Sequence, residues 1–260
     1  IRAGNLLLEY FGKLETKDIR FKNPKDMVTE ADMRAEEFIK SEITKKIPEA
    51  DFVAEESFTG SIPESDNLWI VDPLDGTNNA VRGIPFCCVS IAAADVPKIS
   101  RIHAAVVKNI CTGETFWASQ GEGAYVDGRQ ARPSTVASLR DALIGVDLNP
   151  PLPADRIPSL IRLLRRAKHS RHFGANALEL CYVACGRLEA FVEVRSRMRV
   201  TDLAAGQLII REAGGIIVGG DGRPLDAPAD SPSYRVSFIA AGNKTILNQI
   251  LQVLGLPSSV

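Results

Sequence analysis

Two aspartates in the first third of the chain have the spacing of a metal or phosphate site. The apolar run Leu68–Val71 predicts a buried strand, and Asp72 follows it directly. Because Pro73 cannot donate a backbone hydrogen bond to a sheet, we expect the strand to end there. The Gly-Thr-Asn sequence at 76–78 supplies turn residues and helix N-caps. We therefore expect Asp72 and Asp75 at the end of a strand, beside backbone N–H groups that can face an anion.

Carboxylates at this spacing suit Mg²⁺, which prefers hard oxygen ligands and keeps several of its waters. Asp72 can bridge two ions, Asp75 can hold one, and the Leu74 carbonyl is a further oxygen ligand between them. The competing interpretation is an ordinary type I turn in which both aspartates only cap the backbone. This segment alone leaves both interpretations open.

Three more acidic residues stand where α/β folds gather their sites. Asp32 is expected to open a helix, Glu55 follows a short predicted strand, and Asp202 precedes the small-residue run Ala204–Gly206. Taken singly, Asp32 and Asp202 are also explained as N-cap or first-turn acids, and Glu55 as a solvated loop acid. Together with the first two aspartates, they would provide the ligands that a multi-metal phosphate site requires.

The elements that must position these acids begin with a helix predicted at Asn5–Leu14. A polar loop at Lys17–Asp26 is expected to close over the metals. An amphipathic helix follows Val28–Asp32 and ends at Pro48, and its apolar face is expected to carry Met33, Phe38, Ile39 and Ile43. A short strand is predicted at Asp51–Ala54. Apolar runs separated by turns then predict antiparallel strands at Phe86–Ala93, Ile102–Val107, Glu114–Ala118 and Ala124–Val126.

From about Ser134 onward, predicted helices alternate with predicted strands, which is typical of an α/β lobe. The expected strands are Leu143–Val146, Ala190–Val194, Ile216–Val218 and Val236–Ala241, and the expected helices are Ile157–Arg166, Ala177–Cys185 and Leu203–Glu212. We therefore divide the chain into an N-terminal α+β lobe, residues 1–133, with most of the acidic residues, and a C-terminal α/β lobe, residues 134–260, with Asp202 and the candidate substrate contacts.

Composition argues against several other classes of protein. The 260 residues are 45% hydrophobic and 24% charged, which is typical of a globular protein with a sizeable core. A net charge of −1 gives no electrostatic basis for binding nucleic acid or an anionic membrane. No apolar stretch is long enough to span a bilayer, and no signal peptide is evident. The five cysteines are odd in number and do not combine with histidines at zinc spacing, so we expect reduced thiols in a cytoplasmic protein.

Four separated stretches give the chain its resemblance to the inositol monophosphatase family, the lithium-sensitive, magnesium-dependent phosphatases that include fructose-1,6-bisphosphatases. They are Asp26–Asp32, Glu55–Ser57, Trp69–Asn78, and Thr201–Gly206 running on to Gly215. The combination of Asp-Pro-Leu-Asp-Gly-Thr with a distant Asp-x-Ala-Ala-Gly is highly specific, and the stretches occur in the order found in the family. We therefore reject the interpretation in which Asp72 and Asp75 only cap the backbone of a turn.

The resemblance implies a layered α/β/α/β/α sandwich of two packed lobes, which forms a homodimer and uses two or three Mg²⁺ ions, with Mn²⁺ as a substitute. It implies that Glu55, Asp72 and the Leu74 carbonyl bind the first metal, and that Asp72, Asp75 and Asp202 bind the second. Glu55 with waters would help hold a third ion. Asp32 and Thr77 would orient and deprotonate the attacking water, and the N–H groups of Gly76 and Thr77 would hold the phosphate.

The substrate side of the resemblance places polyol or sugar contacts at Gly174, Asn176 and Glu193. The segment Val194–Arg199 is two residues longer than in the animal inositol phosphatases, and it resembles that of archaeal-type enzymes which accept both inositol monophosphate and fructose 1,6-bisphosphate. Arg195 or Arg197 would then hold a second phosphate, with a solvated basic loop as the alternative. Two other functions stay open: a 3′-nucleotidase acting on adenosine 3′,5′-bisphosphate, and a catalytically inactive binding protein on the same fold.

Overall fold

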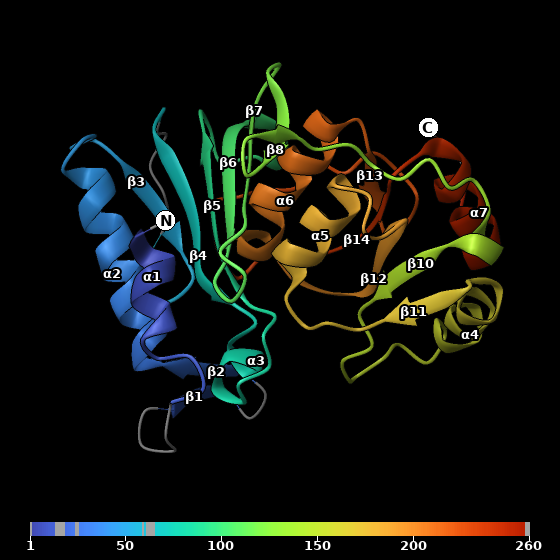
Figure 1. Cartoon of the computed structure of the whole chain (residues 1–260), viewed down its shortest axis with the longest axis horizontal. Helices are drawn as coiled ribbons and strands as arrows, with labels where there is room; N and C mark the ends of the chain where they lie inside the picture. The colour runs from blue at the N-terminus through green and yellow to red at the C-terminus, as the bar shows by residue number, and fades with distance from the viewer. Residues whose placement is uncertain (1, 14–18, 24–25, 59, 61–65, 258–260) are drawn as a thin grey trace.

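Two β-sheets organise the chain (Figure 1). The structure, a computed structural model, describes residues 2–13, 19–23, 26–58, 60 and 66–257. In sheet order, the seven-stranded sheet consists of β3 (Asp51–Ala54), β4 (Leu68–Asp75), β5 (Cys88–Ala94), β6 (Ile102–Asn109), β7 (Thr115–Ser119), β8 (Gly123–Val126) and β9 (Arg129–Gln130). The five-stranded sheet consists of β11 (His169–Arg171), β10 (Leu143–Val146), β12 (Ala190–Arg199), β14 (Arg235–Ala241) and β13 (Ile216–Gly219). A separate hairpin pairs β1 (Ile19–Asn23) with β2 (Asp26–Thr29).

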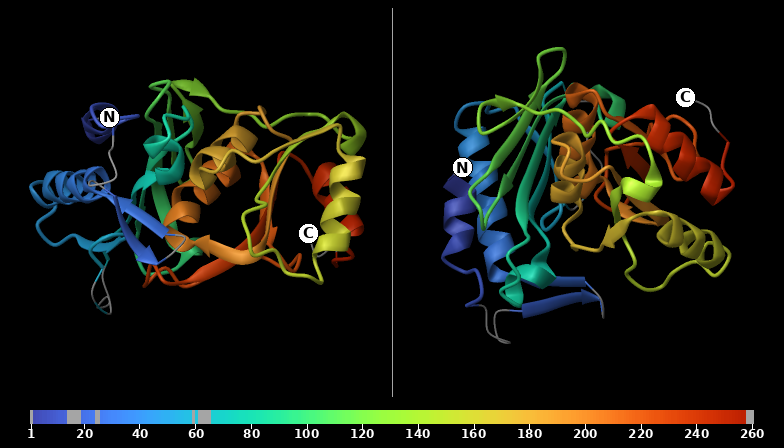
Figure 2. Two further views of the ribbon diagram at one scale, coloured as in Figure 1. Left: turned by 90° about the horizontal axis from the view of Figure 1, so that it is seen from below. Right: turned by 45° about the vertical axis from the view of Figure 1, so that its right-hand side comes forward.

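The helices complete five alternating layers (Figures 1 and 2). The outer face of the seven-stranded sheet is covered by α1 (Arg2–Leu8) and α2 (Glu30–Thr44), and the short α3 (Thr77–Val81) follows β4. Between the sheets lie α5 (Asn176–Ala184) and α6 (Val200–Ala213), while α4 (Ile157–Arg166) and α7 (Lys244–Leu254) cover the outer face of the five-stranded sheet. This arrangement confirms the predicted α/β/α/β/α sandwich.

The central layer depends on small side chains in α6. Every residue of α6 from Val200 to Ile210 is buried, because the helix contacts strands of both sheets as well as α5. A Cβ atom added at Gly206 would lie only 2.6 Å from Cδ1 of Leu180 in α5. Glycine at this position therefore allows the two helices to approach closely, and this packing fixes α6, which carries Asp202, against the end of β4.

Strand directions confirm the antiparallel pairing predicted for the strands between Phe86 and Val126. In the seven-stranded sheet β3 and β4 are parallel, and each later neighbouring pair is antiparallel. In the five-stranded sheet β10 is parallel to β11 and β12, while β12, β14 and β13 pair antiparallel. The lobe boundary between residues 133 and 134 stays a prediction.

Three local predictions were wrong. The strand after Leu68 does not end at Pro73: β4 continues to Asp75, and its pairing with β5 shifts between Asp72 and Asp75, which accommodates the proline at an irregularity. Met33 is 37% exposed and lies outside the buried face of α2. The expected loop at Lys17–Asp26 contains β1 and the start of β2, and the remainder of it lies outside the described residues.

The helix α7 and the short β11 were not anticipated, whereas α4 matches its predicted bounds. Among the described residues, no helix is long and apolar enough to cross a membrane.

Candidate active site

A cleft of about 570 Å³ collects residues from both sheets. Its floor lies where β4 ends and α3 begins, and its other walls come from the first turns of α5 and α6 and from the end of β12. Most of the predicted site residues line it: Glu55, Asp72, Leu74, Asp75, Gly76, Thr77, Gly174, Asn176, Arg195, Arg197 and Asp202. Asp32 and Glu193 lie behind this lining and contact it through hydrogen bonds or ion pairs.

Three carboxylates converge at the centre of the cleft. Glu55, Asp72 and Asp202 each offer an oxygen, and these oxygens all lie within 4.8 Å of one another. Asp72 is 2% exposed and Asp202 is 7% exposed, so at least two of the three groups are held away from bulk water. Asp75, which is also buried, faces the same cleft.

The electrostatics of this cluster are unfavourable without a cation. Burial raises the pKa of Asp72 well above its usual range, and the charges of Glu55, Asp202 and Asp75 raise it further. Burial and the Asp202 charge likewise raise the pKa of Asp75. One compensating charge comes from Arg199, whose Nη1 lies 2.7 Å from Oε1 of Glu55. A compact set of buried carboxylates fits divalent metal ions with a preference for oxygen ligands.

Asp32 and Thr77 are joined by a hydrogen bond. The Thr77 hydroxyl lies 3.1 Å from Oδ1 of Asp32 and 3.0 Å from the Leu74 carbonyl oxygen, and its single proton can serve one acceptor at a time. The other Asp32 oxygen accepts the backbone N–H and the hydroxyl of Thr29, the N-cap of α2. Asp32 is therefore a first-turn acid in a capping box, as one interpretation of the sequence predicted, and it also reaches the cleft through Thr77. Burial raises its pKa, and these hydrogen bonds oppose that effect.

Gly76 connects the carboxylates to α3. Its backbone is left-handed, with φ of 88°, which favours glycine. An added Cβ atom would lie 3.0 Å from both the Ala175 Cβ and the Phe86 carbonyl oxygen. A side chain at position 76 would therefore crowd Ala175 and the Phe86 carbonyl, and it would also strain the turn.

The first turns of α5 and α6 reach the same carboxylates from the other side. The backbone N–H of Ala177 donates to Oδ2 of Asp75 at 2.6 Å. Nδ2 of Asn176 lies 3.5 Å from Oδ2 of Asp202, and the Thr201 hydroxyl donates to Oδ1 of Asp202 at 3.1 Å. Asp202, in the first turn of α6, is thus both a helix-start acid and a member of the cluster.

The arginine-rich segment forms an irregular bulge in β12. Its pairing with β14 shifts between Glu193 and Met198, and Ser196 has a φ of 54°. Glu193 is fully buried, and its Oε1 accepts the backbone N–H of Arg195 at 3.0 Å and lies 3.1 Å from the Arg195 Nε. Burial raises the pKa of Glu193 to about 7, against the lowering effect of the Arg195 charge.

The two arginines proposed for the second phosphate, Arg195 and Arg197, differ in their exposure. The Arg195 side chain is 8% exposed, pairs with Asp147 and donates to the Asn149 carbonyl at 3.0 Å. Arg197 is exposed and lines the cleft. The solvated-loop interpretation therefore does not fit Arg195, whereas an exposed Arg197 on the cleft is compatible with both interpretations.

Sequence reasoning missed three charged residues that line the cleft: Asp147, Arg199 and Arg235. Asp147 directly follows the predicted strand Leu143–Val146, so its position at a strand end was an available signal. Its partner Arg195 lies 48 residues further on, and nothing local in the sequence indicates that pairing.

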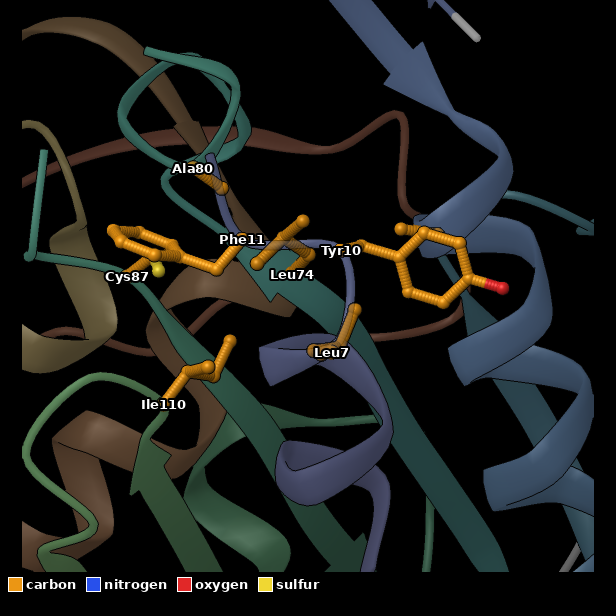
Figure 3. Close-up of a pocket in the computed structure, with 8 residues that line it drawn as sticks. Leu7, Tyr10, Phe11, Leu74, Ala80, Cys87 and Ile110 are labelled. Carbon is orange, nitrogen blue, oxygen red and sulfur yellow. The ribbon is translucent and has the colours of Figure 1, made fainter. Parts of the chain in front are cut away.

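A second, much smaller pocket lies behind the Leu74 side chain (Figure 3). Its volume is about 10 Å³, and its lining is apolar apart from the Tyr10 side chain and the Cys87 thiol. The space holds about one water molecule and no substrate. The chemistry therefore belongs to the larger cleft.

Comparison with known proteins identifies the family of the chain. The model of the inositol monophosphatase family matches residues 1–254. A fructose-1,6-bisphosphatase/inositol-1-monophosphatase of Methanothermobacter thermautotrophicus is 36% identical over 193 residues, which cover 72% of this chain and 67% of that protein. The Nus factor SuhB of Xylella fastidiosa is 34% identical over 97% of this chain and 90% of its own length.

Among solved structures, an IMPase from Thermotoga maritima has a TM-score of 0.83 and 32% sequence identity, covering 98% of this chain and 92% of that chain. The family match spans nearly the whole chain, and the structural likeness extends over the same length. The chain belongs to the inositol monophosphatase family, a family of metal-dependent phosphatases.

Proposed function

We propose that this chain is a Mg²⁺-dependent phosphomonoesterase that hydrolyses inositol monophosphate and fructose 1,6-bisphosphate. The observation that carries the proposal is the convergence of Glu55, Asp72 and Asp202 in one cleft, with their oxygens within 4.8 Å of one another. The Asp32–Thr77 hydrogen bond beside them adds a candidate for handling a proton. The name of the Methanothermobacter relative combines these same two activities.

The residues that would hold the metal ions are those predicted from the sequence. Glu55, Asp72 and the Leu74 carbonyl would hold one ion, and Asp72, Asp75 and Asp202 would hold another. When bound, such ions supply an activated water and neutralise charge on the phosphoryl oxygens. Mn²⁺ is expected to substitute for Mg²⁺, since it accepts the same oxygen ligands.

The side chains around the ions have separate tasks. The Thr77 hydroxyl donates to Asp32, so the Thr77 oxygen would take a proton from the attacking water while its own proton passes to the Asp32 carboxylate. The backbone N–H groups of Gly76 and Thr77 would bind phosphate oxygens as charge develops on them. The alcohol part of the substrate would lie toward Gly174 and Asn176, on the opposite wall.

Arg197 is our candidate for the second phosphate of a bisphosphate substrate. It is exposed on the cleft, whereas Arg195 is already paired with Asp147 and Glu193. Guanidinium groups bind phosphate in a planar, bidentate way. We assign Arg195 and Glu193 the task of holding the bulge that presents Arg197.

The alternatives receive less support. A nucleotidase needs a surface for adenine, and among the described residues no aromatic side chain lines the cleft. A non-catalytic role is suggested by the name of the SuhB relative, but all five predicted metal ligands of this chain line one cleft. Homodimer formation and inhibition by lithium stay predictions from the family resemblance, and a cytoplasmic location stays a prediction from the cysteine content.

The direct test measures phosphate release from inositol 1-phosphate and fructose 1,6-bisphosphate in the presence of Mg²⁺, with Asp75→Asn as the blank. Comparable rates on both substrates would support the proposal. Activity on inositol 1-phosphate alone would refute the proposal that the chain also hydrolyses fructose 1,6-bisphosphate. Failure on both substrates, with hydrolysis of adenosine 3′,5′-bisphosphate, would move the chain to the nucleotidase alternative.

A further inference from the structure

Asn79 is a buried side chain of α3 with no role in the proposed chemistry. It is 9% exposed and lies two residues after Thr77. Its Nδ2 donates to the Phe86 carbonyl at 2.8 Å and to the Phe173 carbonyl at 2.7 Å. Because both partners are carbonyl oxygens, only the amide nitrogen can serve them, and its two hydrogens are both used.

The two carbonyls belong to opposite sides of the molecule. Phe86 precedes β5 in the seven-stranded sheet, and Phe173 follows β11 in the five-stranded sheet. Their rings are stacked, with centroids 4.5 Å apart and an angle of 18° between the planes. Asn79 therefore joins two chain segments at the point where the halves of the molecule meet.

The segment after Phe173 is the one that lines the cleft with Gly174 and Asn176. Gly174 has a φ of 82°, and a Cβ atom added there would lie 3.5 Å from Nδ2 of Asn79. The Gly174 N–H donates to Oε1 of Glu179 at 3.3 Å, and the Ala177 N–H donates to Asp75. The segment is thus held by Asn79 at one end, by Asp75 at the other and by Glu179 in between.

We propose that Asn79 is a positioning residue, which fixes the substrate-facing segment 173–177 at a set distance from the carboxylates of the cleft. Asn79 and Asp75 lie in one stretch of chain, so their bonds to Phe173 and Ala177 tie both ends of this segment to the candidate metal ligands. An alcohol group bound against Gly174 and Asn176 is then held at a fixed distance from the phosphate. The kinetic part of this inference rests on the proposed phosphatase function, whereas the structural part does not.

Hydrogen exchange tests the structural part without any assay of activity. In Asn79→Ala and in the nearly isosteric Asn79→Asp, the backbone amides of residues 173–177 should exchange at least about tenfold faster than in the parent protein, because local opening becomes easier. Asn79→Ser, which keeps one donor, should give an intermediate rate. Asn109→Ala is the matched control: Asn109 is fully buried, its Oδ1 accepts the N–H groups of Cys111 and Thr112, and it does not line the cleft.

Steady-state kinetics test the functional part. A displacement of about 1 Å in a positioned substrate costs about 10²-fold, so we expect kcat/KM to fall about 10- to 100-fold in Asn79→Ala and Asn79→Asp. The affinity for Mn²⁺, measured by calorimetric titration, should change less than kcat/KM does. Asn109→Ala should lower thermal stability without changing kcat/KM.

The outcomes are distinguishable. Faster exchange confined to 173–177, with the kinetic loss, supports the proposal, and equal exchange in parent and variants overturns it. Acceleration spread over the whole chain, or the same kinetic loss in Asn109→Ala, shows a general loss of stability and also overturns it. If the parent protein hydrolyses none of the phosphate esters, the proposed function fails, and the exchange pattern still decides whether Asn79 holds the segment.

Discussion

The two walls of the cleft are held in place by different kinds of interaction. On the β4–α3 wall, a strand irregularity, a proline and a left-handed glycine set the positions of Asp72, Asp75 and Thr77 through the local backbone. On the β12 wall, Arg195 is held by ion pairs with Glu193 and with Asp147, which belongs to a distant part of the chain. The first wall concentrates negative charge that fits a cation, whereas on the second wall the buried carboxylates Asp147 and Glu193 are both paired with Arg195. We therefore expect substitutions on the first wall to affect chemistry, and those at Arg195 to affect stability.

The largest expected effect is on the first wall. Asp75→Asn should lower turnover by about 10³-fold or more, because it removes one candidate ligand of the ions that stabilise charge in the transition state. The amide oxygen can still accept the Ala177 N–H, so the fold should persist. Since Asp202 repels the Asp75 carboxylate, the metal-free variant should unfold at a higher temperature than the parent. Turnover and thermal unfolding measure the two effects.

Asp141→Asn is the control for Asp75→Asn, because Asp141 is exposed and lies outside the cleft. It makes the same change in net charge and should leave turnover unaltered. Near-normal turnover in Asp75→Asn would refute its assignment as a metal ligand.

On the second wall, Arg195→Ala should destabilise the protein by about 3–5 kcal/mol, since it leaves Asp147 and Glu193 as buried carboxylates without their cation. Any activity that remains should fall equally on mono- and bisphosphate substrates. Chemical denaturation measures the loss of stability. Arg165→Ala is the control: Arg165 is exposed, and its removal should change the free energy of unfolding by less than about 0.5 kcal/mol. A loss in Arg195→Ala no larger than in the control would contradict the assignment of these ion pairs.

Glu179 makes a pH-dependent contribution to the free energy of unfolding. Burial raises the pKa of this carboxyl from 4.5 to about 8, and its Oε2 has no hydrogen-bond partner among the described residues. The folded state therefore holds the proton more tightly than the unfolded chain does. This contribution to the free energy of unfolding is complete below about pH 4.5 and is lost as the pH rises to about 8.

Glu179→Gln tests this term because the amide keeps an acceptor for the Gly174 N–H and does not ionise. Denaturation of the metal-free proteins at pH 5 and pH 8 should show that the variant loses less stability than the parent, by about 2–4 kcal/mol. Parallel losses in the two proteins would show that the carboxyl does not stay protonated in the folded state.

The contrast between the walls also explains what the sequence could predict. The Asp-Pro-Leu-Asp-Gly-Thr stretch indicates a turn after the strand, because proline fixes its own φ and glycine permits a left-handed backbone. The positions of Asp32 and Asp202 at helix starts follow from the preference of acids for helix N-termini. The continuation of β4 past Pro73 was not predicted, since it depends on pairing with β5. Nor could the sequence distinguish Arg195 from Arg197. Their difference depends on Asp147, whose approach is a property of the folded five-stranded sheet.

The smallest expected effect lies at Arg197, where the second wall meets solvent. Arg197→Ala should lower kcat/KM for fructose 1,6-bisphosphate about tenfold, the scale of one charge-assisted contact at an exposed site, and should leave inositol 1-phosphate nearly unaffected. Arg197→Lys keeps the charge but loses the bidentate geometry, so its loss should be intermediate. Because an exposed ion pair is screened by salt, the preference of the parent for the bisphosphate should also shrink as ionic strength rises. Equal losses on both substrates, or a preference unaffected by salt, would mean that Arg197 does not contact the second phosphate.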